Sequence, residues 1–202
     1  MKILETDRLI LRHLEPDDLD DLFALYQDPD VVRYIPDAPQ TLAEAKEELD
    51  WFMHGHPRRP ELGLWATIYK PTNQFIGRCG LLPWVIDGQD EVEVAYTIAP
   101  SHWGQGLGTE AAQAILEYGF YTLGFTRLVC LIDEENAASI RVAEKIGMAF
   151  EKASRDEIGP FWLYARHRPA ESESGSSDHP LRSTDDGVRS IRSQGGGGHV
   201  SQ

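Results

Sequence analysis

Three glycines, Gly104, Gly106 and Gly108, alternate with other residues in the segment WGQGLGTEA. This segment lies between a predicted strand at 91–98 and a predicted helix at 106–123. Glycines at such a junction let the main chain approach a ligand closely, and the first amide groups of a helix have no partner within it. Because these N–H groups attract anions, the segment predicts a main-chain site for a pyrophosphate.

Two common phosphate-binding motifs do not fit this segment. No Gly-Lys-Ser/Thr follows, which excludes a Walker A loop. The spacing G-x-G-x-G differs from the G-x-G-x-x-G of dinucleotide-binding proteins, and no acidic residue ends a following strand at the proper distance. The remaining alternative is a glycine-rich turn that only connects a strand to a helix.

The surrounding pattern predicts an α/β (α+β) fold with a mixed sheet. The apolar run 126–132 follows the helix, so these strands and their helix form a unit in which the strands are parallel with a right-handed crossover. The other strands are expected to be antiparallel, starting with a hairpin around 70–74. Thr41 and Glu44 form a capping box, and Gly147 is suited to end the last helix. Further strands are expected at 8–12, 64–69, 75–84, 149–155 and 161–167, and further helices after Pro16, at 41–53 and at 137–146.

The net charge of −14 limits the classes of partner. Binding to nucleic acid needs clustered Lys and Arg, so no nucleic-acid partner is expected, whereas a cationic acceptor such as an amine is weakly favoured. No apolar run reaches the roughly 20 residues of a membrane span, and the N-terminal residues lack the apolar block of a signal peptide. We therefore expect a cytoplasmic protein with no membrane partner. Cys79 and Cys130 are expected to be buried thiols.

The composition changes after Pro169. The segment 169–202 has no aromatic residue, few aliphatic residues and much Ser, Gly and Asp. Such a segment cannot bury enough apolar surface to offset its chain entropy, so we expect a disordered tail. Residues 1–168 are expected to form one domain of ordinary size.

Three segments resemble the GNAT superfamily of N-acetyltransferases, in the same order along the chain. They are TDRLILRHLEPDDLDDL, WGQGLGTEA and NAASIRVAEKIGM. The resemblance covers residues 5–167 and is greatest to the branch with the Rim-type ribosomal-protein N-terminal acetyltransferases. It implies a twisted, mostly antiparallel sheet with a splayed parallel pair of strands and about four flanking helices. It also implies acetyl-CoA as the cosubstrate and direct attack by a primary amine in a ternary complex.

The resemblance also implies which residues bind the cosubstrate. The pantetheine arm is expected between the two parallel strands, where the N–H of Ile98 faces the thioester and stabilises the developing oxyanion. Asn136 is expected to bind the pantetheine, and Trp103 replaces a more usual Gln or Arg beside the phosphates. The full cofactor-binding set is Ile98, Trp103, Gly104, Gln105, Gly106, Leu107, Gly108, Thr109, Asn136 and Ser139.

Acyl transfer to nitrogen needs a neutral amine and therefore a base. An α-amino group has a pKa of about 7.7–8, against about 10.4 for a lysine side chain, so a weak base suffices for a protein N-terminus. Glu93 lies in the strand that resembles the family's glutamate-bearing strand, and it is our candidate, acting directly or through a water. The side chain of Glu91 points to the same face of the sheet, so Glu91 is the rival candidate for the base. A β-bulge would change the face to which it points. Glu93 could instead be a solvated strand glutamate.

The departing thiolate needs a proton donor. Many family members use a tyrosine seven residues after the asparagine, but that position holds Ala143. In the Rim-type branch a serine at the position of Ser139 is the plausible donor, and its alternative role is to cap the helix. His54 and His56 alone do not make a metal site, and no metal is expected.

The acceptor stays open among a protein N-terminus, a polyamine and another small-molecule amine. The fold class allows a homodimer through an edge strand. A rival from another class is a non-catalytic acyl-CoA-binding regulatory module, suggested by the missing tyrosine and the uncertain base. Several aromatic residues either line the acceptor cleft or, more commonly, pack in the core: Trp51, Trp65, Trp84, Tyr96, Phe161 and Trp162.

Overall fold

The computed structural model describes residues 1–56, 59–155 and 159–170. The chain divides into two units, Met1–Pro169 and Ala170–Gln202. The predicted disordered tail at 169–202 lies outside the described residues apart from its first two positions.

Eight strands form one mixed sheet in the order β1-β2-β3-β4-β5-β6-β8-β7. All neighbouring strands are antiparallel except β5 and β6, which are parallel, and this confirms the predicted sheet. The short strand β1 was not predicted, because four residues at a chain end carry little pattern. The strands are β1 (Lys2–Glu5), β2 (Leu9–Arg12), β3 (Gly63–Tyr69), β4 (Gln74–Ile86), β5 (Gln89–Ile98), β6 (Arg127–Ile132), β7 (Ala149–Arg155) and β8 (Pro160–His167).

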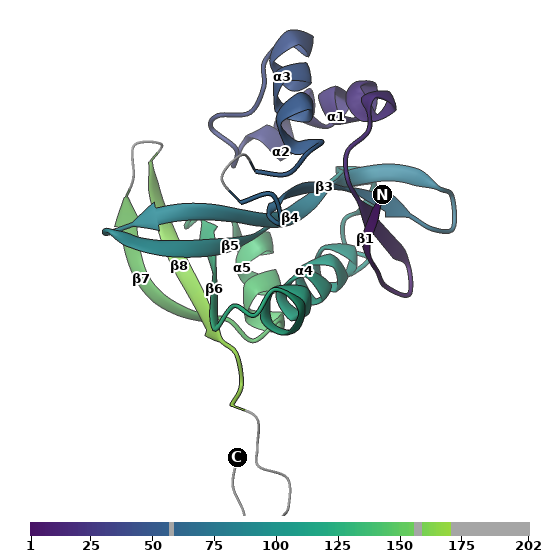
Figure 1. Cartoon of the computed structure of the whole chain (residues 1–202). Coiled ribbons are helices and arrows are strands. Elements are labelled where there is room, and N and C mark those ends of the chain that lie inside the picture. The colour runs from purple at the N-terminus through teal and green to yellow at the C-terminus, as the bar shows by residue number, and fades with distance from the viewer. Residues whose placement is uncertain (57–58, 156–158, 171–202) are drawn as a thin grey trace, which may run out of the picture. The chain divides into compact units, whose positions relative to one another are not determined.

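The α-helices cover both faces of the sheet. Figure 1 shows α1, α2 and α3 on one face and α4 and α5 on the other. The helices are α1 (Leu19–Tyr26), α2 (Pro29–Val32), α3 (Leu42–Phe52), α4 (Leu107–Glu117) and α5 (Ala137–Lys145). The connection from β5 to β6 runs through α4, as predicted, whereas the single turn α2 is too short to give a periodic signal in the sequence.

Local side-chain chemistry sets the helix ends. At the start of α3, Thr41 Oγ1 accepts a hydrogen bond from the N–H of Glu44 at 3.2 Å, and the Glu44 carboxylate accepts one from the N–H of Thr41 at 3.1 Å. This confirms the predicted capping box. Gly147 follows α5 with a φ of +76°, the left-handed conformation that glycine adopts readily. The helix at 106–123 is shorter than predicted, because Tyr118–Thr122 form a π-helical segment.

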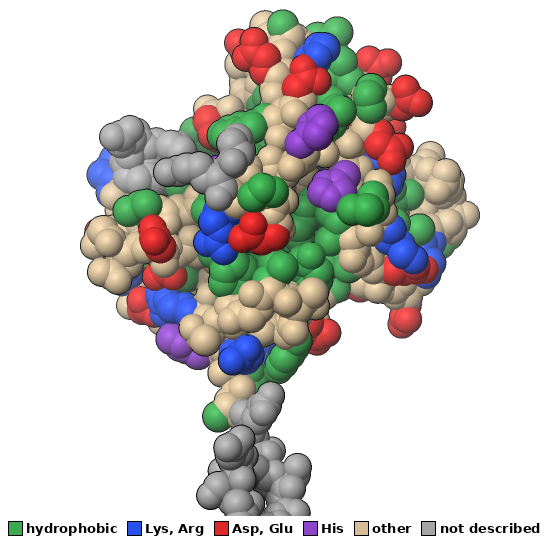
Figure 2. Space-filling view, in the orientation of Figure 1, with side chains coloured by type: hydrophobic (Ala, Val, Ile, Leu, Met, Phe, Trp, Pro, Cys, Tyr) green, Lys and Arg blue, Asp and Glu red, His purple; other side chains and the backbone are tan. Residues whose placement is uncertain are grey.

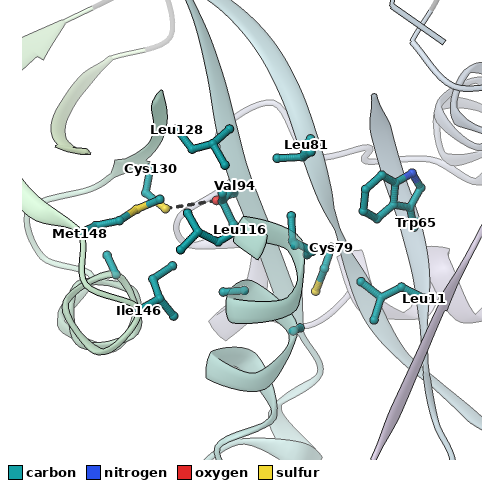
Figure 3. Packing of buried hydrophobic residues seen from close by; sticks show 14 of the residues in the cluster. Leu11, Trp65, Cys79, Leu81, Val94, Leu116, Leu128, Cys130, Ile146 and Met148 are labelled. Carbon is teal, nitrogen blue, oxygen red and sulfur yellow. Dashed lines mark hydrogen bonds between the residues drawn. The ribbon is translucent and has the colours of Figure 1, made fainter. Parts of the chain in front are cut away.

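The largest hydrophobic cluster joins the sheet to α4 and α5 (Figure 3). Cys79 and Cys130 are buried within it as free thiols, which confirms that prediction. The Cys130 thiol donates a hydrogen bond to the carbonyl oxygen of Val94 at 3.2 Å. A second cluster packs the opposite face against α1 and α3, so both faces are fixed by apolar burial.

The parallel strands pair at one register position only, Glu93 with Val129. Beyond it, β5 continues to Ile98 along β4 and β6 continues to Ile132 along β8. The two strands therefore separate toward their carboxyl ends, which confirms the predicted splayed pair. The register of β5 on β4 shows no β-bulge, so the alternation of side chains along β5 is preserved.

Candidate active site

A cavity of about 1660 Å³ opens where β5 and β6 separate. Its walls come from the glycine segment after β5, the ends of β5 and β6, the start of α5, and the chain from α2 to α3. Figure 2 shows a hollow with hydrophobic side chains on its floor between the upper helices and the lower part of the molecule. Segments distant in the sequence thus surround one space large enough for two substrates.

The main chain of β5 presents hydrogen-bonding groups to this gap. The N–H of Ala99 donates to the carbonyl oxygen of Ile76 at 2.7 Å, so odd-numbered residues of β5 direct their N–H and C=O groups toward β4. Even-numbered residues direct theirs toward β6, and those beyond the Glu93–Val129 pair, Tyr96 and Ile98, direct theirs into the gap. The main chain of Ile98 therefore faces the gap, and its contact with a thioester stays a prediction.

Two of the three glycines have backbone conformations that favour glycine. Gly104 has a φ of +74° and Gly106 a φ of +78°, and Gly106 is the N-cap of α4. Both line the cavity, together with Gly108 and Thr109. Because α4 begins at this point, its first N–H groups are the unpaired amides of a helix start.

Two residues of the predicted cofactor-binding set have side chains elsewhere. Leu107 is 1% exposed and packs in the main core, and Gln105 is exposed outside the cavity lining. A role for these residues toward a cosubstrate is therefore limited to their main-chain groups.

Trp103 keeps a polar contact that the sequence did not reveal. Its indole Nε1 donates a hydrogen bond to the carbonyl oxygen of Ile98 at 2.6 Å. The expectation that a tryptophan merely removes a polar side chain from this position is therefore incomplete. The indole binds the last carbonyl of β5 and fixes how the glycine segment leaves the strand.

An N-terminal clasp, made by Thr6, Arg8 and Glu110, holds the glycine segment. Arg8 Nη1 donates to the carbonyl oxygen of Gln105 at 2.9 Å, and Arg8 Nη2 pairs with the Glu110 carboxylate at 2.7 Å. Thr6 Oγ1 and the N–H of Arg8 also donate to Glu110. Sequence reasoning missed this clasp, since its members lie about a hundred positions apart.

Asn136 and Tyr96 fix the start of α5. Asn136 Oδ1 accepts from the N–H of Ser139 at 3.0 Å, so Asn136 is the helix cap, and the alternative role suggested for Ser139 as a cap is wrong. The Tyr96 hydroxyl donates to the carbonyl oxygen of Ser139 at 2.9 Å and joins β5 to α5. Both Asn136 and Ser139 line the cavity.

Glu93 lies at the point where β5 and β6 separate, and it lines the cavity. Its Oε2 accepts a hydrogen bond from the indole Nε1 of Trp84 at 2.6 Å. Burial raises the pKa of Glu93 to about 7, against the opposing effects of the Trp84 hydrogen bond, the main-chain N–H of Leu131 and the charge of Arg78. Its carboxylate therefore exchanges a proton near neutral pH.

Glu91, the rival carboxylate, has another partner. Arg127 Nε donates to its two oxygens at 3.1 and 3.2 Å, and Arg127 also pairs with Glu151. Glu91 does not line the cavity. Of the two glutamates whose side chains point to the same face of the sheet, the geometry favours Glu93 as the base.

Acidic side chains gather on the cavity wall opposite the glycine segment. Asp37 and the α3 residues Glu44, Glu47 and Glu48 line this part. Glu48 pairs with Arg78 at 3.5 Å, so its charge is partly compensated. The remaining carboxylates give this wall a negative potential that attracts cations.

The aromatic residues divide between cavity and core. Trp51, Trp84, Tyr96 and Phe161 line the cavity, whereas Trp65 is 1% exposed in the main core. Over the described ranges, no three His, Cys, Asp or Glu side chains are grouped as a metal site would require.

A family model described as the acetyltransferase (GNAT) domain matches residues 8–149. The chain belongs to the GNAT family of acetyltransferases. This GNAT protein is 41% identical over 166 residues to the uncharacterized protein YkkB of Bacillus subtilis (strain 168), covering 81% of this chain and 94% of that protein. It is 27% identical over 168 residues to spermidine N(1)-acetyltransferase of Escherichia coli (strain K12), covering 79% and 81%.

Solved structures share the fold. A GNAT acetyltransferase from Bacillus anthracis matches with a TM-score of 0.70 and 26% identity, over 83% of this chain and 98% of that one. RimL, a ribosomal L7/L12 α-N-protein acetyltransferase in complex with coenzyme A, matches with a TM-score of 0.67 over the same shares. Its identity is 18%, so this likeness supports the fold and does not establish the Rim-type branch. Among the helices that the structure describes, none is both long and apolar enough to cross a membrane.

Proposed function

We propose that this GNAT acetyltransferase transfers an acetyl group from acetyl-CoA to a primary amine by direct attack within a ternary complex. The observation that carries the proposal is the position of Glu93, at the opening of the gap between β5 and β6. A carboxylate there is close both to the gap that would hold the thioester and to the acidic wall from which an amine would approach. With a pKa near 7, it suits the removal of a proton from the attacking nitrogen.

The main chain would bind acetyl-CoA. Amides from Gly104 to Thr109 would hold the pyrophosphate at the start of α4, and the pantetheine arm would pair with the even-numbered residues of β5. A main-chain N–H of β5 nearer to Glu93, that of Tyr96, would stabilise the oxyanion that develops on the thioester carbonyl. The N–H of Ile98 lies about 17 Å along β5 from Glu93 and would instead bind the pantetheine arm. The Trp103–Ile98 hydrogen bond and the clasp support this role, because they hold the glycine segment and the end of β5 in one arrangement.

Proton transfers complete the reaction. Glu93 accepts the proton of the attacking nitrogen, the C–N bond forms, and the C–S bond breaks to give the acetylated amine and a CoA thiolate. The Ser139 hydroxyl is the proposed hydrogen-bond donor that stabilises this thiolate, which then takes up a proton from solvent, since capping by Asn136 uses the N–H of Ser139 and not its hydroxyl. Membership in a family of acetyltransferases favours this enzyme over a non-catalytic acyl-CoA-binding module.

The acidic wall supports a cationic acceptor. Asp37, Glu44 and Glu47 would attract an ammonium group before Glu93 removes its proton. The relationship to a spermidine acetyltransferase also supports an amine. A protein N-terminus, a polyamine and another small-molecule amine all remain candidates.

The direct test is incubation with acetyl-CoA and panels of peptides, polyamines and other small amines. Release of free thiol that depends on one acceptor class is the expected result, with the acetylated product identified by mass spectrometry. Tight binding of acetyl-CoA without thiol release on any panel would contradict the proposal and favour the binding module.

Substitution of Asn136 separates its two roles. Asn136→Ala should lower the free energy of unfolding by about 1 kcal/mol, because α5 loses its cap. Asn136→Ser keeps a capping oxygen and should lose little stability. Both variants lose the side-chain amide donor proposed for pantetheine, so both should bind acetyl-CoA up to about tenfold more weakly in calorimetry. Unchanged affinity in both variants would leave Asn136 as a helix cap only.

A further inference from the structure

We propose that Trp84 is a positioning residue that holds one oxygen of Glu93 and sets the pH range in which Glu93 accepts a proton. This inference rests on the proposed function, in which Glu93 is the base. Trp84 is not one of the predicted catalytic or cofactor-binding residues. From the sequence it is only one of six aromatic residues that either line the acceptor cleft or pack in the core.

The geometry comes from neighbouring strands. Trp84 lies in β4 directly opposite Glu91, and Glu93 lies two positions along β5 on the same face. The indole Nε1 donates to Glu93 Oε2 at 2.6 Å, and both side chains line the cavity. A donor at this distance fixes the carboxylate in one orientation and leaves its remaining lone pairs for an incoming amine.

Other groups also face Glu93, and their effects are distinct. Arg78 of β4 and the N–H of Leu131 of β6 favour the ionised carboxylate, whereas Asp37 disfavours it. Cys130 of β6 and Tyr96 of β5 have pKa values raised by burial, so they stay protonated near neutral pH. Among the interactions that favour the ionised form, the Trp84 hydrogen bond is the largest.

A hydrogen bond to the ionised form lowers the pKa of a carboxyl group. The indole N–H does not titrate in this range, so its effect on Glu93 is constant across neutral pH. Without it, burial would dominate and the pKa of Glu93 would rise, by about one to two units for a hydrogen bond to a charged group. Glu93 would then be protonated at neutral pH and unable to act as a base.

The first experiment tests the hydrogen bond between Trp84 and Glu93 without measuring catalysis. The chain has five tryptophans, and their indole N–H signals can be followed by ¹H–¹⁵N NMR in the full-length protein between about pH 5.5 and 9. The Trp84 signal, assigned by its loss in Trp84→Phe, should shift with a midpoint near 7, and this shift should vanish in Glu93→Gln. The indole of Trp103, which binds a main-chain carbonyl, should not show this titration and is an internal control.

The second experiment measures the pH profile of kcat/KM. In Trp84→Phe the acidic limb of this profile should shift to higher pH by about one to two units. The value of kcat/KM at pH 7 should fall by about tenfold or more and should recover toward pH 9. Trp51→Phe is the matched control: Trp51 lines the same cavity and contacts the rings of Phe52 and His56, so this variant should leave the limb where it is. A merely structural loss in Trp84→Phe would lower activity at every pH.

A Trp84 signal that does not titrate, or that titrates equally in Glu93→Gln, would overturn the proposal, as would an unmoved acidic limb in a folded Trp84→Phe. These outcomes are separate from failure of the proposed function. If Glu93→Gln retains full turnover, Glu93 is not the base, whatever the indole signals show.

Discussion

Replacing Glu93 with Gln should lower kcat by about 10²- to 10⁴-fold while acetyl-CoA still binds with its original affinity. The amide fills the same space and can still accept the Trp84 hydrogen bond, but it cannot take a proton from the attacking amine. Stopped-time assays of thiol release and calorimetric titration with acetyl-CoA measure the two effects separately.

Glu91→Gln is the control variant for Glu93→Gln, and the stability of Glu93→Gln is a second check. Glu91→Gln alters the rival carboxylate, which pairs with Arg127 outside the cavity, and should leave kcat within a few-fold. Glu93→Gln should also be at least as stable as the parent above pH 7. The folded-state pKa of Glu93 is raised from 4.5 to about 7, so ionising this carboxylate opposes folding as pH rises through that range. Loss of activity in Glu91→Gln with full activity in Glu93→Gln would reverse the assignment.

Gly104→Asp should weaken acetyl-CoA binding by about 200-fold. A negative charge about 5 Å from the pyrophosphate costs about 3 kcal/mol at an effective dielectric constant near 20. Aspartate tolerates the left-handed backbone better than most residues, so the effect on affinity is mainly electrostatic. Calorimetry at several ionic strengths checks this origin, because added salt should reduce the loss.

Gly88 offers a matched control for this substitution. It has a φ of +75°, against +74° for Gly104, and at both glycines an added Cβ would meet nothing within 4 Å. Gly88 lies in the β4–β5 turn and does not line the cavity. Gly88→Asp should therefore lose similar stability but keep its affinity. Equal affinities in the two variants would place the pyrophosphate away from the glycine segment.

The periodic and motif-bearing parts of the fold were predictable from the sequence. The strand–helix–strand unit around the glycine segment requires a parallel pair, and the capping box at Thr41 starts α3 where predicted. The same segment indicated a phosphate site, because alternating glycines before a helix have a direct main-chain consequence. Two elements of four residues, β1 and α2, were not predicted, since their position is decided by the packing around them, whereas the equally short β2 was predicted from its apolar residues.

The chemistry of the site depends on contacts that no local pattern contains. The alternation of side chains along β5 left Glu91 and Glu93 equivalent. Only the divergence of β5 from β6 separates them, because Glu91 pairs with Arg127 and Glu93 lies half-buried beside Trp84. The role of Trp103 toward Ile98 and the Arg8–Glu110 clasp likewise depend on which distant segments meet. The sequence by itself determined the parallel unit and the glycine segment, because these follow from short-range spacing, and the resemblance of three segments indicated the family. The tertiary structure alone decided that the pKa of Glu93 lies near neutral pH, because burial and interaction partners set a pKa and both arise from long-range packing.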